Sequence, residues 1–294
     1  MINQKYLKWI NKNIHTDLTD RVIFISGGNS GIGFETTRFC LYLKMKVIWG
    51  CRNENKALIS KNKILEEFPN ACLDIVKLDL ADLSTVRMVA SFLKPRYEKI
   101  DYLYNNAGVY RLDKDHTKDG YDLTIGTNVI GTYVLTNEFI SLYPNIKVIL
   151  TSSITTRFAN IDYSDFQMDK KYSKAKAYSN SKLMTNHLYL HYINTNENNN
   201  FNIVHPGGTY TPLIQKGYKN KVVQVLGKGF MKIFFHSPSK ASLCSMYALN
   251  DDVNKCYIGP RGLFGLSGYP KIKKMPRKSC FNYQKTIESI NKLI

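Results

Sequence analysis

The stretch RVIFISGGNSGIG, residues 21–33, joins an apolar run to a cluster of glycines. The apolar run predicts a buried strand over residues 21–27, and the residues from 31 to 45 predict the helix that follows it. Gly27, Gly31 and Gly33 have the spacing G-x-x-x-G-x-G at the junction. Gly27 permits the tight turn, Gly31 lets the backbone approach a pyrophosphate, and Gly33 lets the helix pack closely on the sheet. Because a helix N-terminus offers free N–H groups and a partial positive charge, we expect this turn to bind a nucleotide.

The rest of the chain alternates short β-rich runs with longer helical ones. Further strands are predicted over residues 46–52, 73–80, 100–108, 147–153 and 201–208. Helices are predicted over residues 55–68, 83–94 and 121–143, with another beginning near Tyr178. Such alternation indicates βαβ units and a parallel sheet. We therefore predict a single α/β domain over residues 21–294, a Rossmann-type doubly wound parallel sheet with helices on both faces, preceded by an extension, residues 1–20, with one short helix.

The chain is strongly basic, with 41 Lys and Arg residues against 23 Asp and Glu residues and a formal net charge of +18. The basic residues are spread along the chain, and the one dense run is YPKIKKMPRKS, residues 269–279. This dispersion predicts no specific nucleic-acid partner, while peripheral contact with an anionic membrane stays open. No apolar run reaches the roughly 20 residues of a membrane span.

The cysteines and histidines predict neither a disulfide scaffold nor a metal site. The six cysteines are scattered without a C-x-x-C pair, which is typical of a reducing, cytoplasmic setting. His187 and His191 are four residues apart but lack an evident third ligand. The N-terminus also lacks the apolar segment of a secretory signal.

Arg52 follows the second predicted strand, in WGCRNENK. About 20 residues beyond the glycine turn, a dinucleotide fold reads the adenosine ribose, where an acidic residue accepts hydrogen bonds from a free 2′-hydroxyl. A planar guanidinium instead suits a 2′-phosphate. Arg52 therefore predicts NADP(H) as the cofactor, with NAD(H) as the alternative.

Tyr178 and Lys182, in YSNSK, are four residues apart and lie on one face of the predicted helix. An ammonium near a phenol stabilises the phenolate, so we expect Lys182 to lower the pKa of Tyr178. A tyrosine tuned in this way exchanges a proton with an alcohol or a carbonyl. The spacing alone is weak evidence, because the chain contains 20 tyrosines and many lysines.

Several motifs in one order over residues 21–211 resemble the short-chain dehydrogenase/reductase family. They are SGGNSGIG, Asp79 in KLDLADL, NNAG at residues 105–108, Asn128 in IGTNVIGTY, LTSS at residues 150–153, YSNSK, and HPGGTYT at residues 205–211. The resemblance implies an oxidoreductase that moves a hydride between a nicotinamide and an alcohol or carbonyl.

The resemblance also implies roles for individual residues. Tyr178 is the expected acid/base, Lys182 holds the nicotinamide ribose, Ser153 hydrogen-bonds the substrate oxygen, and Asn128 anchors a water that links Lys182 to solvent. Ser152 is the alternative to Ser153. Residues expected to bind the cofactor are Gly27, Asn29, Ser30, Gly31, Ile32, Gly33, Arg52, Asp79, Leu80, Asn106, Ala107, Gly108, Tyr178, Lys182, Pro206, Gly207, Thr209 and Thr211.

The stretches GGNSGIGFET, FANIDYSDF and YIGPRGLFGLSGYP are similar to the retinol-dehydrogenase-like branch of that family. This implies a lipophilic small-molecule substrate and a monomer or homodimer. The apolar, glycine-broken stretch at about 212–238 is expected to form a lid, and a C-terminal segment at about 255–294 to pack on the cofactor domain. The competing function is a nucleotide-binding sensor or scaffold of the same fold without turnover.

Overall fold

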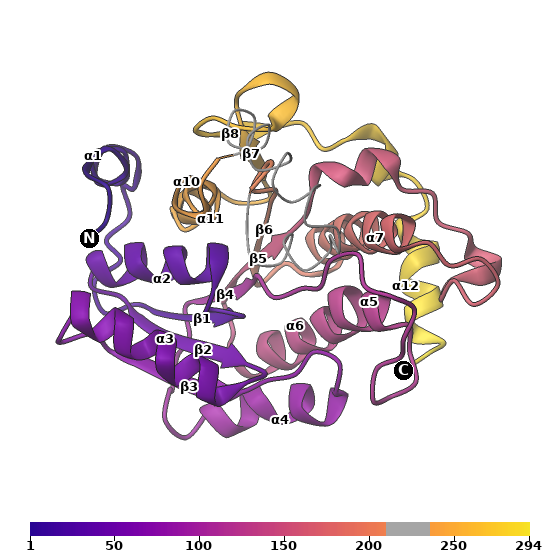
Figure 1. Ribbon diagram of the computed structural model, residues 1–294, viewed down its shortest axis with the longest axis horizontal. Helices are drawn as coiled ribbons and strands as arrows, with labels where there is room; N and C mark the ends of the chain where they lie inside the picture. The colour runs from indigo at the N-terminus through magenta and orange to yellow at the C-terminus, as the bar shows by residue number, and fades with distance from the viewer. Residues whose placement is uncertain (210–235) are drawn as a thin grey trace, which may run out of the picture.

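Across residues 1–209 and 236–294, which the computed structural model describes, eight strands form one sheet in the order β3-β2-β1-β4-β5-β6-β7-β8 (Figure 1). The strands are β1 Val22–Ser26, β2 Lys46–Cys51, β3 Leu73–Lys77, β4 Tyr102–Asn105, β5 Lys147–Thr151, β6 Asn200–Val204, β7 Tyr257–Pro260 and β8 Pro270–Lys273. Neighbouring strands are parallel except β7 and β8, which are antiparallel. The chain reverses direction across the sheet between β3 and β4, so the carboxyl ends of β1 and β4 meet at a topological switch point where α/β folds bind ligands.

Helices cover both faces of the sheet (Figure 1). The α-helices are α1 Gln4–Asn13, α2 Gly31–Tyr42, α3 Glu54–Glu67, α4 Leu83–Leu93, α5 Leu123–Ile125, α6 Gly131–Leu142, α7 Lys174–Thr195, α10 Pro238–Ala241, α11 Leu243–Tyr247 and α12 Tyr283–Asn291. Short 3-10 turns are η2 Ile154–Phe158, η3 Tyr163–Asp165, η4 Leu263–Gly265 and η5 Arg277–Cys280.

Alternation along the buried strands divides the core into two clusters. Successive side chains of a strand point to opposite faces, so Phe24 packs with α4, α6 and α7. Ile23 and Ile25 pack instead with α2, α3 and α11. All five residues of β1 are buried, as expected for a strand of a parallel sheet covered on both sides. The rigid sheet thus fixes the ends of β1, β4 and β5 relative to one another.

The two last strands were not predicted from the sequence. β7 has four residues and includes Gly259 and Pro260, and β8 begins at Pro270. Both residue types are poor strand signals, although proline is tolerated at the first residue of an edge strand. The segment expected to pack on the cofactor domain therefore extends its sheet.

The helix boundaries differ from prediction in two places. The predicted helix over residues 121–143 contains a π-helical turn, η1 Gly126–Ile130, between α5 and α6. The helix predicted to begin near Tyr178 begins one turn earlier, at Lys174, after Ser173 in extended conformation. Tyr178 and Lys182 therefore lie inside α7, where both φ and ψ are helical and their relative placement is set by the backbone.

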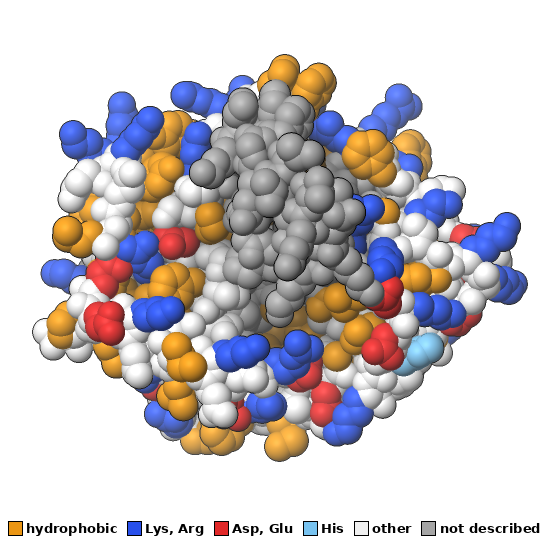
Figure 2. All heavy atoms as spheres, in the orientation of Figure 1, with side chains coloured by type: hydrophobic (Ala, Val, Ile, Leu, Met, Phe, Trp, Pro, Cys, Tyr) orange, Lys and Arg blue, Asp and Glu red, His pale blue; other side chains and the backbone are white. Residues whose placement is uncertain are grey.

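At the surface, Figure 2 shows Lys and Arg side chains distributed over the visible face with Asp and Glu between them. No helix in the described residues combines the length and the apolar character needed to cross a bilayer. All six cysteines are free thiols.

Candidate active site

The glycine turn joins β1 to α2 and its glycines are each constrained. Gly27 has φ +67° and Gly31 has φ +56°, and the Gly27 N–H donates to the Gly50 carbonyl at 2.8 Å. A Cβ at Gly33 would lie 2.5 Å from the Gly27 carbonyl oxygen. A side chain at Gly33 would therefore separate α2 from the turn. Gly28 has no place in the spacing used to predict the turn, yet its Cβ would lie 2.0 Å from Trp49 Cδ1, so the indole of β2 requires glycine there.

The N-terminus of α2 has the donors that a phosphate needs. Ser30 is its N-cap and makes no side-chain cap bond, and the first turn has no acidic residue. Within the described parts of the chain, the N–H groups of Gly31, Ile32 and Gly33 have no hydrogen-bond partner. Half-buried Asn29 precedes them, and Ser30 is exposed. These free donors, at the positive end of a helix of twelve residues, fit an anionic group such as a pyrophosphate.

The end of β4 is fastened to the glycine turn. The Asn106 side-chain amide donates to the carbonyls of Ser26 and Gly27 at 3.0 and 3.1 Å. The Ser26 hydroxyl accepts from the N–H groups of Asn106 and Ala107 at 3.1 and 3.0 Å. Sequence analysis named Asn106 and Ala107 but missed Ser26, which is fully buried. This network holds the predicted floor of the nucleotide site together.

Arg52 lies exposed just beyond β2, where the adenosine ribose was predicted. The Lys77 ammonium donates to the Arg52 carbonyl at 2.7 Å. Lys77 closes β3 and was not predicted as a site residue, because only the sheet order brings the ends of β2 and β3 together. The corner thus combines two cations.

Asp79 and Leu80 follow β3. The Asp79 carboxylate accepts from the Ala81 N–H at 3.0 Å, and its own N–H donates to Thr85 Oγ1 at 3.0 Å. Leu80 is buried, and its carbonyl lies where a Cβ at Gly131 would come within 2.3 Å. Gly131 therefore lets α6 pack against this loop.

Ser153, Tyr178 and Lys182 come together at the ends of β5 and α7. The Ser153 hydroxyl lies near enough to the Tyr178 phenol to lower its pKa. The Lys182 ammonium donates to the Thr151 carbonyl at 2.8 Å and lies 5.9 Å from the centroid of the Tyr178 ring. Ser152 is directed elsewhere, since its buried hydroxyl donates to Asn186 Oδ1 at 2.5 Å. Of the two serines, Ser153 is therefore the one whose hydroxyl acts on the Tyr178 phenol.

The expected lowering of the Tyr178 pKa is wrong for the protein by itself. Burial raises the pKa of Tyr178 to about 12, the nearby Ser153 hydroxyl lowers it, and Tyr110 raises it. The Tyr110 ring packs edge-on against Tyr178, with centroids 4.7 Å apart. Burial lowers the pKa of Lys182 to about 8. The ammonium is directed to the Thr151 carbonyl instead of to the phenol oxygen, so burial dominates both groups.

Asn128 lies in the π-helical turn η1 and holds the loop after β4. Its Oδ1 accepts from the Val109 N–H at 2.7 Å, and its Nδ2 donates to the Val109 carbonyl and to Ser181 Oγ, both at 3.0 Å. A Cβ at Gly108 would lie 3.0 Å from Asn128 Oδ1 and 3.8 Å from Lys182 Nζ. Gly108 thus keeps space open between these two side chains. Such π turns recur at functional sites.

The loop after β6 is held by His236. Its Nε2 bonds the Pro206 carbonyl at 2.5 Å, and Thr209 Oγ1 donates to the same carbonyl at 3.3 Å. Gly207 has φ +77°, and its Cβ would lie 2.5 Å from the Leu266 carbonyl. Thr211 and the predicted lid up to residue 235 lie outside the described residues.

His187 and His191, the two histidines considered for a metal site, contact different parts of the structure. His187 Nδ1 bonds Thr286 Oγ1 at 2.6 Å, and the His191 ring lies beside Tyr133. No group of three or more metal-binding side chains occurs within residues 1–209 and 236–294.

The chain is similar to known proteins over most of its length. The sequence model of the short chain dehydrogenase family matches residues 21–221. The chain belongs to this family of oxidoreductases. Retinol dehydrogenase 14 of Mus musculus is 29% identical over 251 residues, which cover 79% of this chain and 75% of that relative. The polyprenol dehydrogenase of Danio rerio is 30% identical over 241 residues, covering 78% of this chain and 73% of that relative.

These relatives confirm the predicted retinol-dehydrogenase-like branch. A solved structure, an uncharacterised protein of Mycobacterium paratuberculosis, has a TM-score of 0.74 at 24% identity and covers 94% of this chain and 95% of that one. The fold class predicted from the glycine turn and the strand–helix alternation is therefore confirmed.

Proposed function

We propose that this protein is an NADP(H)-dependent oxidoreductase that interconverts a lipophilic alcohol and its carbonyl compound, with Tyr178 as the acid/base. The observation that carries the proposal is the cluster formed by Ser153, at the end of β5, with Tyr178 and Lys182 on successive turns of α7, where the Lys182 ammonium lies 5.9 Å from the Tyr178 ring centroid. The free N–H groups at the start of α2 support a nucleotide as the cofactor that works with Ser153, Tyr178 and Lys182. When bound, the nicotinamide supplies or accepts the hydride.

In this mechanism Ser153 and Tyr178 both face the substrate oxygen. Ser153 donates a hydrogen bond that stabilises negative charge on that oxygen. Tyr178 gives its proton during carbonyl reduction and takes one during alcohol oxidation. A phenol of high pKa is protonated at neutral pH, which suits the reductive direction. Oxidation needs the phenolate, and the Ser153 hydroxyl is the neighbour that lowers the pKa of Tyr178 toward it.

Asn128 and Lys182 provide the route by which Tyr178 exchanges protons with solvent. In this proposal a water bridges the two side chains beside Gly108, where a Cβ would lie 3.0 Å from Asn128 Oδ1 and 3.8 Å from Lys182 Nζ. Asn128 is fixed by both of its bonds to Val109, so its position is set before any ligand binds. We assign it a positioning role for this reason.

The preference for NADP(H) is supported by the corner that holds Arg52 and Lys77. Both are exposed cations, and the bond from the Lys77 ammonium to the Arg52 carbonyl brings them together. A 2′-phosphate carries more than one negative charge and pairs with two cations better than a ribose hydroxyl does. The names of the retinol and polyprenol dehydrogenases support a lipophilic substrate. The free cysteines support a reducing compartment, for which we propose the cytoplasm.

The test of cofactor choice compares NADPH and NADH binding by nucleotide fluorescence for wild type and Arg52→Asp. A lost charge-assisted contact costs about 1.5–3 kcal/mol, or about 10–100-fold in Kd. We expect wild type to prefer NADPH and Arg52→Asp to lose that preference, whereas Lys63→Asp, an exposed change on α3, keeps it. Equal binding of both nucleotides by wild type contradicts the NADP(H) assignment. Failure to bind either nucleotide contradicts the oxidoreductase proposal itself.

A sensor or scaffold without turnover is the competing function, and the raised pKa of Tyr178 is the observation in its favour. A buried phenol that stays protonated is also what an inactive relative would have. The two functions differ in single-turnover hydride transfer from bound NADPH to retinal, the aldehyde of retinol. Transfer supports the enzyme, and tight NADPH binding without transfer to retinal or shorter aldehydes supports the sensor.

A further inference from the structure

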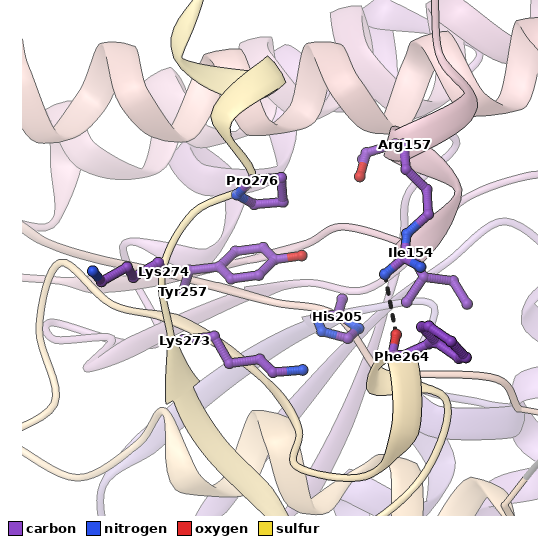
Figure 3. A pocket seen from close by; sticks show the side chains of 9 residues that line it. Ile154, Arg157, His205, Tyr257, Phe264, Lys273, Lys274 and Pro276 are labelled. Atoms are coloured by element: carbon purple, nitrogen blue, oxygen red, sulfur yellow. Dashed lines mark hydrogen bonds between the residues drawn. The ribbon is translucent and has the colours of Figure 1, made fainter.

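A cavity of about 340 Å³ lies beside the strands β6, β7 and β8 (Figure 3). Its walls come from η2, the end of β6, and the C-terminal run that contains β7, η4 and the end of β8. Ile154, the residue after Ser153, lines it. The cavity therefore begins next to the proposed catalytic serine, and its size suits part of a small organic molecule.

The wall of the cavity carries positive charge without compensation. Arg157, Lys273 and Lys274 line it, and none of the nine lining residues is acidic. Arg157 donates to the Phe264 carbonyl at 3.1 Å and Lys273 to the Pro260 carbonyl at 2.9 Å. In the described part of the chain, no carboxylate lies within ion-pair distance of these three cations. Burial lowers the pKa of Lys273, and the neighbouring Arg157 lowers it further.

His205 adds a buried polar side chain to the wall of the cavity. Its side chain is 3% exposed, and its Nδ1 has no hydrogen-bond partner among the described residues. Figure 3 shows the imidazole between Tyr257, Lys273 and Phe264, and its ring stacks on Tyr257 with centroids 5.4 Å apart. Buried polar groups in proteins are nearly always hydrogen-bonded. Burial, with Lys273 and Arg157, lowers the pKa of His205 to about 3, so the ring is neutral and has a proton to donate.

The rim of the cavity is apolar and partly strained. Phe264 lines the cavity with 65% of its surface exposed, and its φ of +52° lies in the left-handed region that a bulky residue rarely adopts. Leu263 and Phe158 flank lining residues in the chain and are 76% and 75% exposed. Exposed apolar groups held in this way are typical of ligand contacts.

We propose that this cavity binds the head group of an anionic amphiphile, a small molecule with a carboxylate or phosphate on an apolar chain, with Arg157 and Lys273 facing the anion and Phe264 contacting the chain. The proposal concerns binding alone and does not depend on hydride transfer. An anion there neutralises the cationic wall, and the His205 imidazole offers it a further donor.

The test is calorimetric titration of the full chain, without nucleotide, with decyl phosphate below its micelle concentration. Decanol and inorganic phosphate serve as the neutral and the chainless probes. The variant is Arg157→Met combined with Lys273→Met, and Arg157→Met alone serves if the double variant unfolds, because Arg157 is exposed. Lys271→Met is the matched control, since Lys271 is an exposed lysine on β8 that does not line the cavity.

We expect wild type and Lys271→Met to bind decyl phosphate more tightly than they bind decanol or inorganic phosphate. The double variant should bind it at least about 10-fold more weakly, as the loss of charge-assisted contacts requires. Equal binding by wild type and the double variant, or binding of decanol as tight as that of decyl phosphate, overturns the proposal. So does binding only to vesicles of phosphatidylcholine mixed with phosphatidic acid, with none of the dispersed probe.

Discussion

Replacing Gly33 by alanine tests how the glycine turn presents its donors. The added Cβ would lie 2.5 Å from the Gly27 carbonyl oxygen and 2.6 Å from Asn106 Nδ2, where ordinary contacts are about 3.5–4.0 Å. The nearest atom is backbone in a turn fastened by Asn106, so the start of α2 has to move by about 1 Å. A shift of this size stretches an N–H···O bond of about 2.9 Å beyond its useful range.

The expected cost falls on binding more than on stability. Losing one or two bonds to a charged phosphate costs about 3 kcal/mol, which corresponds to about 100-fold in Kd for NADPH. Overpacking costs about 1–3 kcal/mol in stability, while alanine in a helix recovers about 1 kcal/mol relative to glycine. Fluorescence titration with NADPH and urea unfolding measure the two effects separately. Gly126→Ala is the control. Its Cβ would lie 2.4 Å from Thr117 Cγ2, outside the glycine turn, so this variant should lose stability and keep NADPH binding. A folded Gly33→Ala protein that binds NADPH within about threefold of wild type would refute this reasoning.

Three other outcomes follow from the site. Ser153→Ala should lower kcat by about 10²-fold or more. It should also move the pH profile of alcohol oxidation to higher pH, because the Ser153 hydroxyl lowers the pKa of Tyr178. Ser152→Ala should do neither, and the reverse pattern would mean that the two serines are misassigned. Burial lowers the pKa of Lys182 to about 8, so the unfolded chain binds more protons than the folded one between about pH 8 and about pH 10.5. The contribution of Lys182 to the free energy of unfolding should therefore rise with pH across this window and be lost as pH falls through 8. Urea unfolding of Lys182→Met should lack this slope. Asn128→Ala leaves the Val109 backbone groups without their partner and should cost about 1–3 kcal/mol in urea unfolding and lower kcat, whereas a variant of wild-type stability would show that water replaces the amide.

Local patterns were enough to predict the sheet core and the elements that hold the site. The apolar run before SGGNSGIG predicted β1 and the start of α2, and the i,i+4 spacing of Tyr178 and Lys182 placed both on α7. These features are set within a few residues of chain, so their sequence signal is strong. The strands β7 and β8 were missed because Gly259, Pro260 and Pro270 weaken that signal, and their pairing partners lie elsewhere in the chain.

The features that escaped prediction depend on tertiary contacts. The pKa of Tyr178 was expected to fall through Lys182. Burial raises it instead, Tyr110 adds to the rise, and the Lys182 ammonium is bound to the Thr151 carbonyl. Lys77 reaches Arg52 only because β2 and β3 are neighbours, and Gly28 is required only because Trp49 covers it. The cationic cavity likewise draws on five separate segments, so no single stretch of sequence predicts it.

The central claim is that Tyr178 transfers the proton while NADPH transfers the hydride. Its most direct test is the single-turnover rate of retinal reduction by the NADPH-loaded protein, compared between wild type and Tyr178→Phe, with the NADPH Kd measured for both. The account predicts a rate at least about 10²-fold lower in Tyr178→Phe with an unchanged Kd, because the phenol hydroxyl is lost and the ring that packs on Tyr110 is kept. A Tyr178→Phe protein that reduces retinal within about threefold of the wild-type rate would contradict the claim.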